Sequence, residues 1–303
     1  MNGEKLAIVR PVAMTAGSSL VTSSNVAELH TTYDPLEWNA LTAYIIGDRA
    51  ARASLHKVYQ RRVAGTTATA PESDTTNWVE VGVTNKWKAF DDSYQSQVSN
   101  ADTIQYVFTP AEYVDTVTVL NAQCKTATLS DGLTYNETAD MYGRTVMDWY
   151  DYYFEQFVFK SDFSFLNVPL SLTAVLTLTL DNTGGTAMVG EIKMGRAREI
   201  GGVRYGARTG IIDYSAKTED EWGNLVITQK PYRKRMSVEM WVLNTFIDEM
   251  HRLFSSYRAT PIVIIGAGNL YECLIAYGFI RSFENVIAYP TDSMCSAEFE
   301  GLS

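Results

Sequence analysis

Cysteine and histidine are scarce in this sequence of 303 residues, which contains three of each. The cysteines, Cys124, Cys273 and Cys295, are odd in number, far apart and without a Cys-x-x-Cys motif. This excludes a disulfide framework and a cysteine-rich zinc site, and it fits assembly in a reducing cytoplasm. No histidine has metal-ligand spacing to another histidine or to a cysteine, so we expect neither a metal ion nor a cofactor.

Long apolar runs and an excess of positive charge are also missing. No stretch approaches the roughly 18–20 apolar residues of a membrane-spanning helix, so we expect no membrane insertion. The first residues show no basic segment followed by a long apolar run, so we expect no signal peptide. The net charge of −10 argues against nucleic acid as a partner. Residues 232–235, which are locally basic, are interpreted as a strand edge or a subunit contact.

Motifs of common catalytic sites are absent as well. The chain contains no G-x-S-x-G, P-loop or H-E-x-x-H motif. Residues 266–268 read G-A-G after an expected strand, but Tyr271 takes the third glycine position of a dinucleotide-binding loop, so a hairpin turn is predicted. The carboxylates Asp91 and Asp92 are interpreted as a solvated turn or, alternatively, as part of a calcium site. The sequence therefore predicts a protein that is not an enzyme and has no catalytic residues.

Alternation of apolar and polar residues is abundant. Between residues 171 and 180, leucine and alanine share one face, while threonine and valine share the other. Ile104, Tyr106 and Phe108 repeat this pattern. Strict alternation is typical of half-buried antiparallel strands. The sequence therefore predicts a mainly β fold, in which residues 85–196 form an antiparallel, jelly-roll-like β-sandwich.

The N-terminal part of the chain divides into two segments. Residues 1–34 contain a strand candidate near residues 20–23, and we expect this segment to pair with the sandwich. Asp34 and Pro35 form a turn signal that marks a boundary. Residues 35–84 are expected to be a small β module inserted into the sandwich, because insertions at loop tips cost little closure entropy.

Residues 197–303 are expected to form a C-terminal β-rich domain that takes part in the assembly of a larger structure. Its one helix is predicted at residues 245–257, where apolar residues recur on a single face. Asn244 is the expected N-cap of this helix, and Pro261 is expected to stop it.

The densest aromatic run of the chain spans residues 149–159 and reads W-Y-D-Y-Y-F-E-Q-F-V-F. Aromatic side chains contribute large buried areas to protein cores. We therefore interpret the run as core and sheet face rather than as a ligand site.

Four aromatic residues stand out in the small module: Trp38, Tyr44, Tyr59 and Trp78. A segment of this size cannot build a large core, so these rings either make a compact mini-core or form a platform on the surface. An aromatic platform can hold a sugar, because the C–H faces of a pyranose ring are apolar while its edges carry hydroxyl groups. The four residues are therefore candidate carbohydrate-binding residues, and the mini-core is the alternative.

The spacing of these aromatics resembles that of small chitin- and cellulose-binding modules. The pattern is W-x5-Y-x2-G-D, then V-Y, then W-x-E-V-G. The matching positions are Trp38, Tyr44, Gly47, Asp48, Val58, Tyr59, Trp78, Glu80, Val81 and Gly82. The resemblance implies a small carbohydrate-binding fold. Gln60, Arg61 and Arg62 stand where the secreted chitinase versions usually carry a further aromatic pair.

The chain as a whole resembles tail-tip or baseplate proteins of tailed bacteriophages. The resemblance is carried, in this order, by residues 20–28, the module running into 84–92, and residues 149–160, 195–215 and 234–238. It implies a non-enzymatic structural protein of the virion, assembled in the host bacterial cytoplasm. Its implied partners are the central hub and other tail-tip proteins, further copies of itself in a trimer or hexamer, and a host-surface polysaccharide.

Two alternatives to this function stay open. In the first, the chain is a polysaccharide-directed enzyme, with residues 85–303 as the catalytic domain and the module as a targeting appendage. In the second, the module no longer binds sugar and is only a spacer or a subunit contact. New reducing ends in a polysaccharide would distinguish an enzyme from a binding protein.

Overall fold

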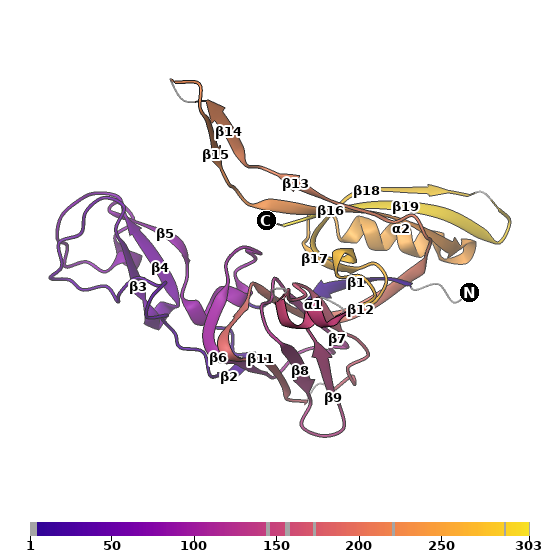
Figure 1. The fold of residues 1–303 in the computed structure, drawn as a ribbon, viewed down its shortest axis with the longest axis horizontal. Coiled ribbons are helices and arrows are strands. Elements are labelled where there is room, and N and C mark those ends of the chain that lie inside the picture. Colours follow the sequence, from indigo (N-terminus) through magenta and orange to yellow (C-terminus); the bar gives the residue numbers. More distant parts are fainter. Residues whose placement is uncertain are drawn as a thin grey trace.

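Antiparallel β-sheets are the main structural elements of the chain (Figure 1). The structure is a computed structural model and describes residues 5–143, 146–154, 158–171, 174–219, 222–287 and 289–302. The named strands form sheets of nine, five, three and two strands. The predicted fold class is confirmed: the protein is mainly β, its sheets are antiparallel, and a helix lies in the C-terminal part.

The five-stranded sheet is one layer of the sandwich and has the order β2-β6-β11-β8-β9. Its strands are β2 (Val21–Ser24), β6 (Val98–Phe108), β8 (Thr126–Ser130), β9 (Asn136–Asp140) and β11 (Leu176–Val189). The predicted alternation is present in β11, where Leu176, Leu178 and Leu180 are buried and the intervening threonines are only partly buried. Residues 172 and 173 of the predicted strand lie outside the described residues.

The N-terminal segment contributes to both large sheets. Strand β2 pairs with β6, with Val21 opposite Phe108, which is the pairing expected of the strand candidate. The small module lies between β2 and β6 in the chain, so it is inserted between two neighbouring strands of one sheet. Strand β1 (Lys5–Pro11), which the sequence did not indicate, instead pairs with β12 and β17.

The nine-stranded sheet has the order β10-β7-β12-β1-β17-β18-β19-β16-β13. Besides β1, its strands are β7 (Thr116–Leu120), β10 (Phe163–Phe165), β12 (Glu191–Val203), β13 (Arg208–Asp213), β16 (Tyr232–Leu243), β17 (Ile262–Ile265), β18 (Ile275–Val286) and β19 (Asp292–Gly301). Because β12 also pairs with β16, the strands from β12 to β16 close into a barrel. Leu6, Ile8, Val238, Met240 and Phe299 share the core inside it.

Strand β12 belongs to the sandwich and to the barrel. Its first half carries Ile192, which shares a core with Val117 of β7 and with Tyr106 of the five-stranded sheet. Its second half pairs with β1 and β16. A Cβ atom on Gly195 would lie 2.3 Å from the carbonyl oxygen of Arg10, so glycine permits the close approach of β1. The expected division between residues 196 and 197 therefore falls inside a continuous strand.

The predicted C-terminal helix is confirmed as α2 (Ile247–Ser256), preceded by the 3-10 turn η4 (Asn244–Phe246). Met250 and Phe254 are its buried residues, and they pack into the core of the barrel. The expected N-cap is wrong, because Phe246 takes the N-cap position of α2 in place of Asn244. Asn244 Nδ2 instead donates to the Tyr289 carbonyl oxygen, and its Oδ1 accepts from Ser293 Oγ. Other 3-10 turns are η1 (Ala53–Leu55), η2 (Pro71–Ser73), η3 (Asn85–Phe90) and η5 (Glu272–Leu274).

The aromatic run at residues 149–159 is not core, contrary to the prediction. Its first part is the short helix α1 (Trp149–Phe154), in which no residue is buried. The Asp148 carboxylate accepts a hydrogen bond from the Asp151 backbone N–H, and the Asp151 carboxylate accepts one from the Met147 N–H. These local bonds favour a helix start over a strand. Residues 155–157 of the run lie outside the described residues.

A two-stranded ribbon stands away from the barrel (Figure 1). It continues β13 and β16 through β14 (Ala216–Glu219) and β15 (Leu225–Thr228), which pair with each other. Its apolar side chains include Ile211, Leu225 and Ile227, all of them exposed. The ribbon therefore presents apolar surface that the described part of the chain does not cover.

Candidate functional site

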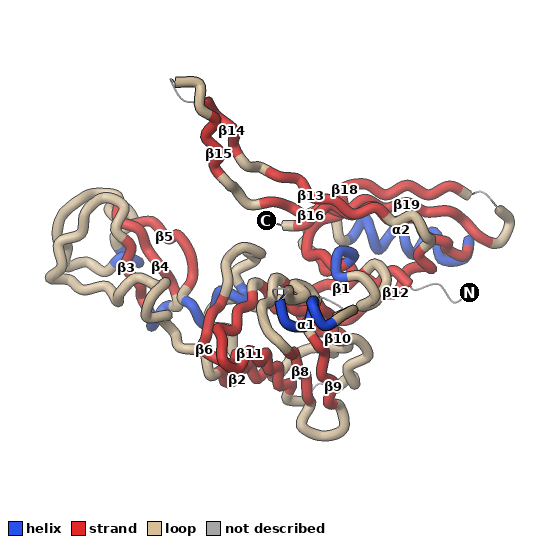
Figure 2. Tube along the Cα trace, in the orientation of Figure 1, coloured by secondary structure: helices blue, strands red, loops and turns tan. Residues whose placement is uncertain are grey.

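The small module is a three-stranded antiparallel sheet surrounded by loops (Figure 2). Its strands are β3 (Arg49–Arg52), β4 (Lys57–Arg61) and β5 (Trp78–Val83). The loop before β3 is tied to the sheet by isolated bridges from Glu37 to Ala51 and from Tyr44 to Gly65. The aromatic residues of the motif are therefore held on a common scaffold.

Two of the four candidate residues form the core of the module. Trp78 is 2% exposed and Tyr59 is 6% exposed, and both pack with Ala50. Tyr44 packs on the same core, with its ring edge-to-face against Trp78 at 4.9 Å between centroids. For Tyr59 and Trp78, the structure thus favours the mini-core over the flat surface platform.

Trp38 is partly buried beside this core, and its ring is covered by a cation. The Arg52 guanidinium lies 5.4 Å from the centroid of the Trp38 ring. Arg52 is held there by two hydrogen bonds to the Glu72 carboxylate, at 2.8 and 3.1 Å, and by an ion pair with Glu37. Because Trp38 is covered and Trp78 is buried, the four aromatic rings do not make one exposed face.

Arg61 is an interior residue of the module. Its side chain is buried, and its guanidinium lies 5.0 Å from the centroid of the Trp78 ring. Its Nη2 donates a hydrogen bond to the carbonyl oxygen of Gly65. The arginine therefore occupies an interior position, where it packs against the tryptophan by a cation–π contact.

A pocket of about 320 Å³ opens beside the module core. Its lining residues are Leu55, Lys57, Tyr59, Pro71, Glu72, Thr75, Trp78 and Glu80. The structure thus brings Tyr59 and Trp78 together at one pocket, while Trp38 and Tyr44 do not line it. Sequence reasoning missed Pro71, Glu72 and Thr75 because they lie in a loop rich in threonine, alanine and proline, with no motif to single them out.

Polar side chains surround the apolar part of the pocket. Lys57 Nζ donates to the Glu80 carboxylate at 2.7 Å, and this hydrogen bond raises the pKa of Lys57. Burial raises the pKa of Tyr59, so its phenol stays protonated at neutral pH. Apolar surface together with several donors and acceptors is the composition that a hydroxylated ligand requires.

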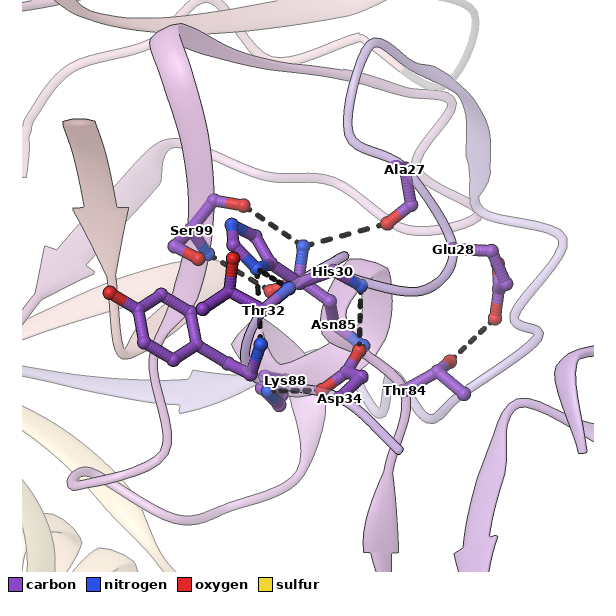
Figure 3. A network of polar contacts seen from close by, with 10 residues as sticks. Ala27, Glu28, His30, Thr32, Asp34, Thr84, Asn85, Lys88 and Ser99 are labelled. Carbon is purple, nitrogen blue, oxygen red and sulfur yellow. Dashed lines mark hydrogen bonds and ion pairs between the residues drawn. The ribbon is translucent and has the colours of Figure 1, made fainter. Parts of the chain in front are cut away.

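A polar network fixes the module to the sandwich (Figure 3). We call it the base network and define it by Glu28, His30, Asp34, Thr84, Asn85, Lys88 and Ser99. One Asp34 carboxylate oxygen accepts hydrogen bonds from the backbone N–H groups of His30 and Asn85. The other forms an ion pair with Lys88 at 2.8 Å. One nearly buried carboxylate therefore joins both ends of the inserted segment.

Asn85 and Glu28 complete the base network. The side chain of Asn85 donates to the Ser99 carbonyl oxygen at 2.9 Å and accepts from the Ser99 N–H at 3.0 Å. The Glu28 carboxylate accepts from Thr84 Oγ1 and contacts His56 Nδ1 of the module at 2.7 Å. Because these groups are largely buried, the module is held in a defined orientation.

The paired carboxylates Asp91 and Asp92 lie outside the module. Asp92 accepts a hydrogen bond from Lys193 Nζ at 2.8 Å and one from the Tyr277 hydroxyl at 2.7 Å. Within the described ranges, no group of three or more His, Cys, Asp or Glu side chains is arranged to hold a metal ion. Among these same residues, no helix is both long and apolar enough to cross a membrane.

Comparison of the chain with protein-family models, curated proteins and solved structures gives no match. The resemblances to a carbohydrate-binding module and to a bacteriophage tail-tip protein therefore stay predictions. The geometry of the module and of its base network is the basis for a functional proposal.

Proposed function

We propose that this chain is a non-enzymatic structural protein of a bacteriophage tail tip or baseplate, and that its small module binds a polysaccharide of the host surface. The observation that carries the proposal is the pocket beside Tyr59 and Trp78, on a module that buried polar contacts hold to the sandwich. A fixed orientation suits a protein that must present a ligand site away from its own assembly.

The pocket supports recognition of one sugar unit rather than adsorption to a flat crystalline surface. Leu55, which is 40% exposed, offers apolar surface to the ring of a sugar, and the nearly buried Trp78, Tyr59 and Pro71 also line the pocket. Glu72 and Glu80 offer acceptors to the hydroxyl groups of the sugar. Each site binds weakly in this proposal. Several copies of the chain in one assembly then give the strong attachment through avidity.

Exposed apolar surfaces support self-association and contact with other tail-tip proteins. The rings of Trp149 and Phe154 on α1 are largely exposed, as are Ile211 and Leu225 on the ribbon. Exposed apolar patches of this kind mark sites of protein association. In the proposal they face further copies of the chain, in a trimer or hexamer, and the central hub of the tail.

An array of bacterial surface polysaccharides tests the proposal. The full chain and a variant lacking residues 35–84 are compared at the same concentration, and both are first checked for folding and for oligomeric state. Binding by the full chain that is lost in the deletion variant supports the proposal. A folded, oligomeric full chain that binds no glycan contradicts it.

A second candidate function is that the module is only a spacer or a subunit contact. The burial of Tyr59 and Trp78 favours this candidate, because these aromatics already have a structural role. It predicts that deleting residues 35–84 changes the oligomeric state. It also predicts that neither the full chain nor the deletion variant binds a glycan. Sedimentation of each chain gives its oligomeric state, and the array gives its glycan binding. The two measurements together therefore separate the two functions.

A further inference from the structure

A lysine and two carboxyl groups meet where the sandwich joins the barrel. Glu191 and Lys193 lie two residues apart on β12 and therefore face the same side of the strand. Lys193 Nζ lies 2.7 Å from a Glu191 carboxylate oxygen and 2.8 Å from Oδ1 of Asp92. The Tyr277 hydroxyl donates to the same Oδ1 at 2.7 Å, and the Lys193 ammonium lies 4.8 Å from the centroid of the Tyr277 ring.

The glutamate and the lysine of this group are removed from water, whereas the Asp92 side chain is 61% exposed. Glu191 is fully buried, and Lys193 is 5% exposed. Burial raises the pKa of Glu191 to about 8, although the nearby charge of Lys193 opposes this effect. Glu191 therefore carries a proton at neutral pH. Burial and the hydrogen bond to Asp92 also raise the pKa of Tyr277, so its hydroxyl remains a donor.

We propose that Lys193 and Asp92 condense to form an intramolecular isopeptide bond, with Glu191 as the proton relay and Tyr277 as the hydrogen-bond donor to the reacting carboxyl group. The arrangement places the Lys193 nucleophile in contact with the Asp92 electrophile and with the buried acid–base group of Glu191. Their contact replaces the encounter of separate reactants and so removes the entropic part of the barrier to amide formation.

The reaction starts from the ion pair of Lys193 and Asp92. One proton passes from Nζ to the Asp92 carboxylate, which leaves a neutral amine and a neutral carboxyl group. The Nζ lone pair then attacks Cγ, and the Tyr277 hydroxyl stabilises the negative charge that develops on Oδ1. Glu191 gives its proton to the departing hydroxyl group and takes the second proton from the nitrogen. One water molecule leaves, the nitrogen keeps one hydrogen, Glu191 returns to its initial state, and no co-reactant is consumed.

The position of Asp92 suits this reaction. Its backbone has a φ of 60°, a left-handed conformation that aspartate tolerates, and it directly follows the segment that contains η3. The Asp92 side chain is 61% exposed, so the departing water has a path to solvent. The new bond would join the end of this segment, close to the module, to the strand shared by sandwich and barrel.

Two other shielded lysine–carboxylate pairs lack this arrangement. Lys88 pairs with Asp34, and Lys234 pairs with Asp162. Among the described residues, neither lysine forms an ion pair with a second carboxylate that could relay protons. Of the three pairs, only Lys193 and Asp92 are expected to react, and Lys234→Arg therefore serves as a matched control.

The test is the intact mass of the purified full chain, followed by mapping of its peptides. The wild-type chain is expected to weigh less than its sequence by one water molecule, and digestion is expected to yield a cross-linked peptide pair containing Lys193 and Asp92. Lys193→Arg and Glu191→Gln should restore the full mass, whereas Lys234→Arg should keep the deficit. Asp92→Asn should lose one ammonia in place of one water, because the leaving group is then an amide nitrogen.

A folded wild-type chain that keeps its full mass on prolonged incubation overturns the proposal. A water deficit that persists in Lys193→Arg, or that maps to another residue, also overturns it. If Glu191→Gln or Lys193→Arg does not fold, the wild-type peptide map and the ammonia loss of Asp92→Asn still decide the matter. None of these readouts depends on glycan binding, so the proposed function can fail independently.

Discussion

Trp78 is the residue on which the small module depends most. Its ring is buried between the rings of Tyr44 and Tyr59 and the guanidinium of Arg61. A module of this size has few aliphatic residues to replace that volume, so one indole supplies a large share of its core.

Replacing Trp78 by alanine is expected to destabilise the module by about 3–5 kcal/mol, because the substitution removes the largest side chain of the mini-core. Limited proteolysis should then cut within residues 35–84 while the sandwich and barrel stay resistant. Trp38→Ala should have a smaller effect, since Trp38 is only partly buried. Equal protease resistance of Trp78→Ala and the wild type would contradict the mini-core.

Glu191 should make stability depend on pH. Its folded-state pKa of about 8 lies above its ordinary value of 4.5, so the folded chain retains a proton that the unfolded chain releases between these values. The free energy of unfolding therefore falls as pH rises from about 4.5 to 8, by at most about 1.4 kcal/mol per pH unit.

Denaturant unfolding of Asp92→Ala and of Asp92→Ala/Glu191→Gln measures this effect in chains that cannot form the proposed cross-link. The double variant should gain stability relative to the single variant as pH increases. Parallel pH profiles for the two chains would show that Glu191 does not titrate as described.

Local rules predict burial poorly inside the module. The register shifts between Val58 and Tyr59, so both residues are buried although they are neighbours in one strand. Strict alternation cannot anticipate this, because a bulge breaks the period of two. The candidate residues Tyr59 and Trp78 could be chosen from the motif, but their place at a pocket beside Glu72 depends on how the loop folds over the sheet.

At the scale of elements, long periodic segments were predictable and short or shared ones were not. In β11, buried leucines alternate with threonines, and in α2 the apolar residues recur on one face. These periodic patterns are long enough to identify the element despite local exceptions. Helix α1 spans six residues and is set by local hydrogen bonds of Asp148 and Asp151. Strand β12 belongs to both the sandwich and the barrel because it pairs with strands that are far away in the chain. A local sequence pattern cannot predict such pairing.

The base network gives a prediction for the joint between module and sandwich. Asn85→Ala removes both partners of the buried Ser99 backbone groups, which should cost about 1–3 kcal/mol. Amide hydrogen exchange near Ser99 and in η3 should accelerate. Asn136→Ala on β9 is the control, because Asn136 is exposed. This substitution should leave amide hydrogen exchange near Ser99 and in η3 unchanged. Similar exchange in Asn85→Ala and wild type would argue against a fixed joint.

At the scale of the whole molecule, the exposed helix α1 should contribute to self-association. Replacing Trp149 and Phe154 by serine is expected to weaken association at least tenfold, about 1.4 kcal/mol, because exposed aromatics often anchor interfaces. Sedimentation velocity over a concentration series measures this change. The unfolding temperature of the isolated chain should stay nearly constant, since no residue of α1 is buried.

The control for α1 is Leu133→Ser, which removes another side chain that is 85% exposed. It lies in the turn between β8 and β9, away from the aromatic run. Equal effects of the two changes on association would mean that α1 has no special part in the assembly.

The central claim is that the pocket of the small module binds a glycan. Thr75 lines the pocket, and its neighbour Thr76 is also exposed but does not line it. Thr75→Arg should place a guanidinium against Glu72 and Glu80 and fill the pocket, while Thr76→Arg adds the same charge outside it.

The most direct measurement is therefore a titration of the wild type and these two variants with the polysaccharide that the full chain binds best. The account predicts that Thr75→Arg abolishes binding and that Thr76→Arg binds like the wild type. Undiminished binding by a folded Thr75→Arg chain would contradict the account and place the glycan contact elsewhere on the molecule.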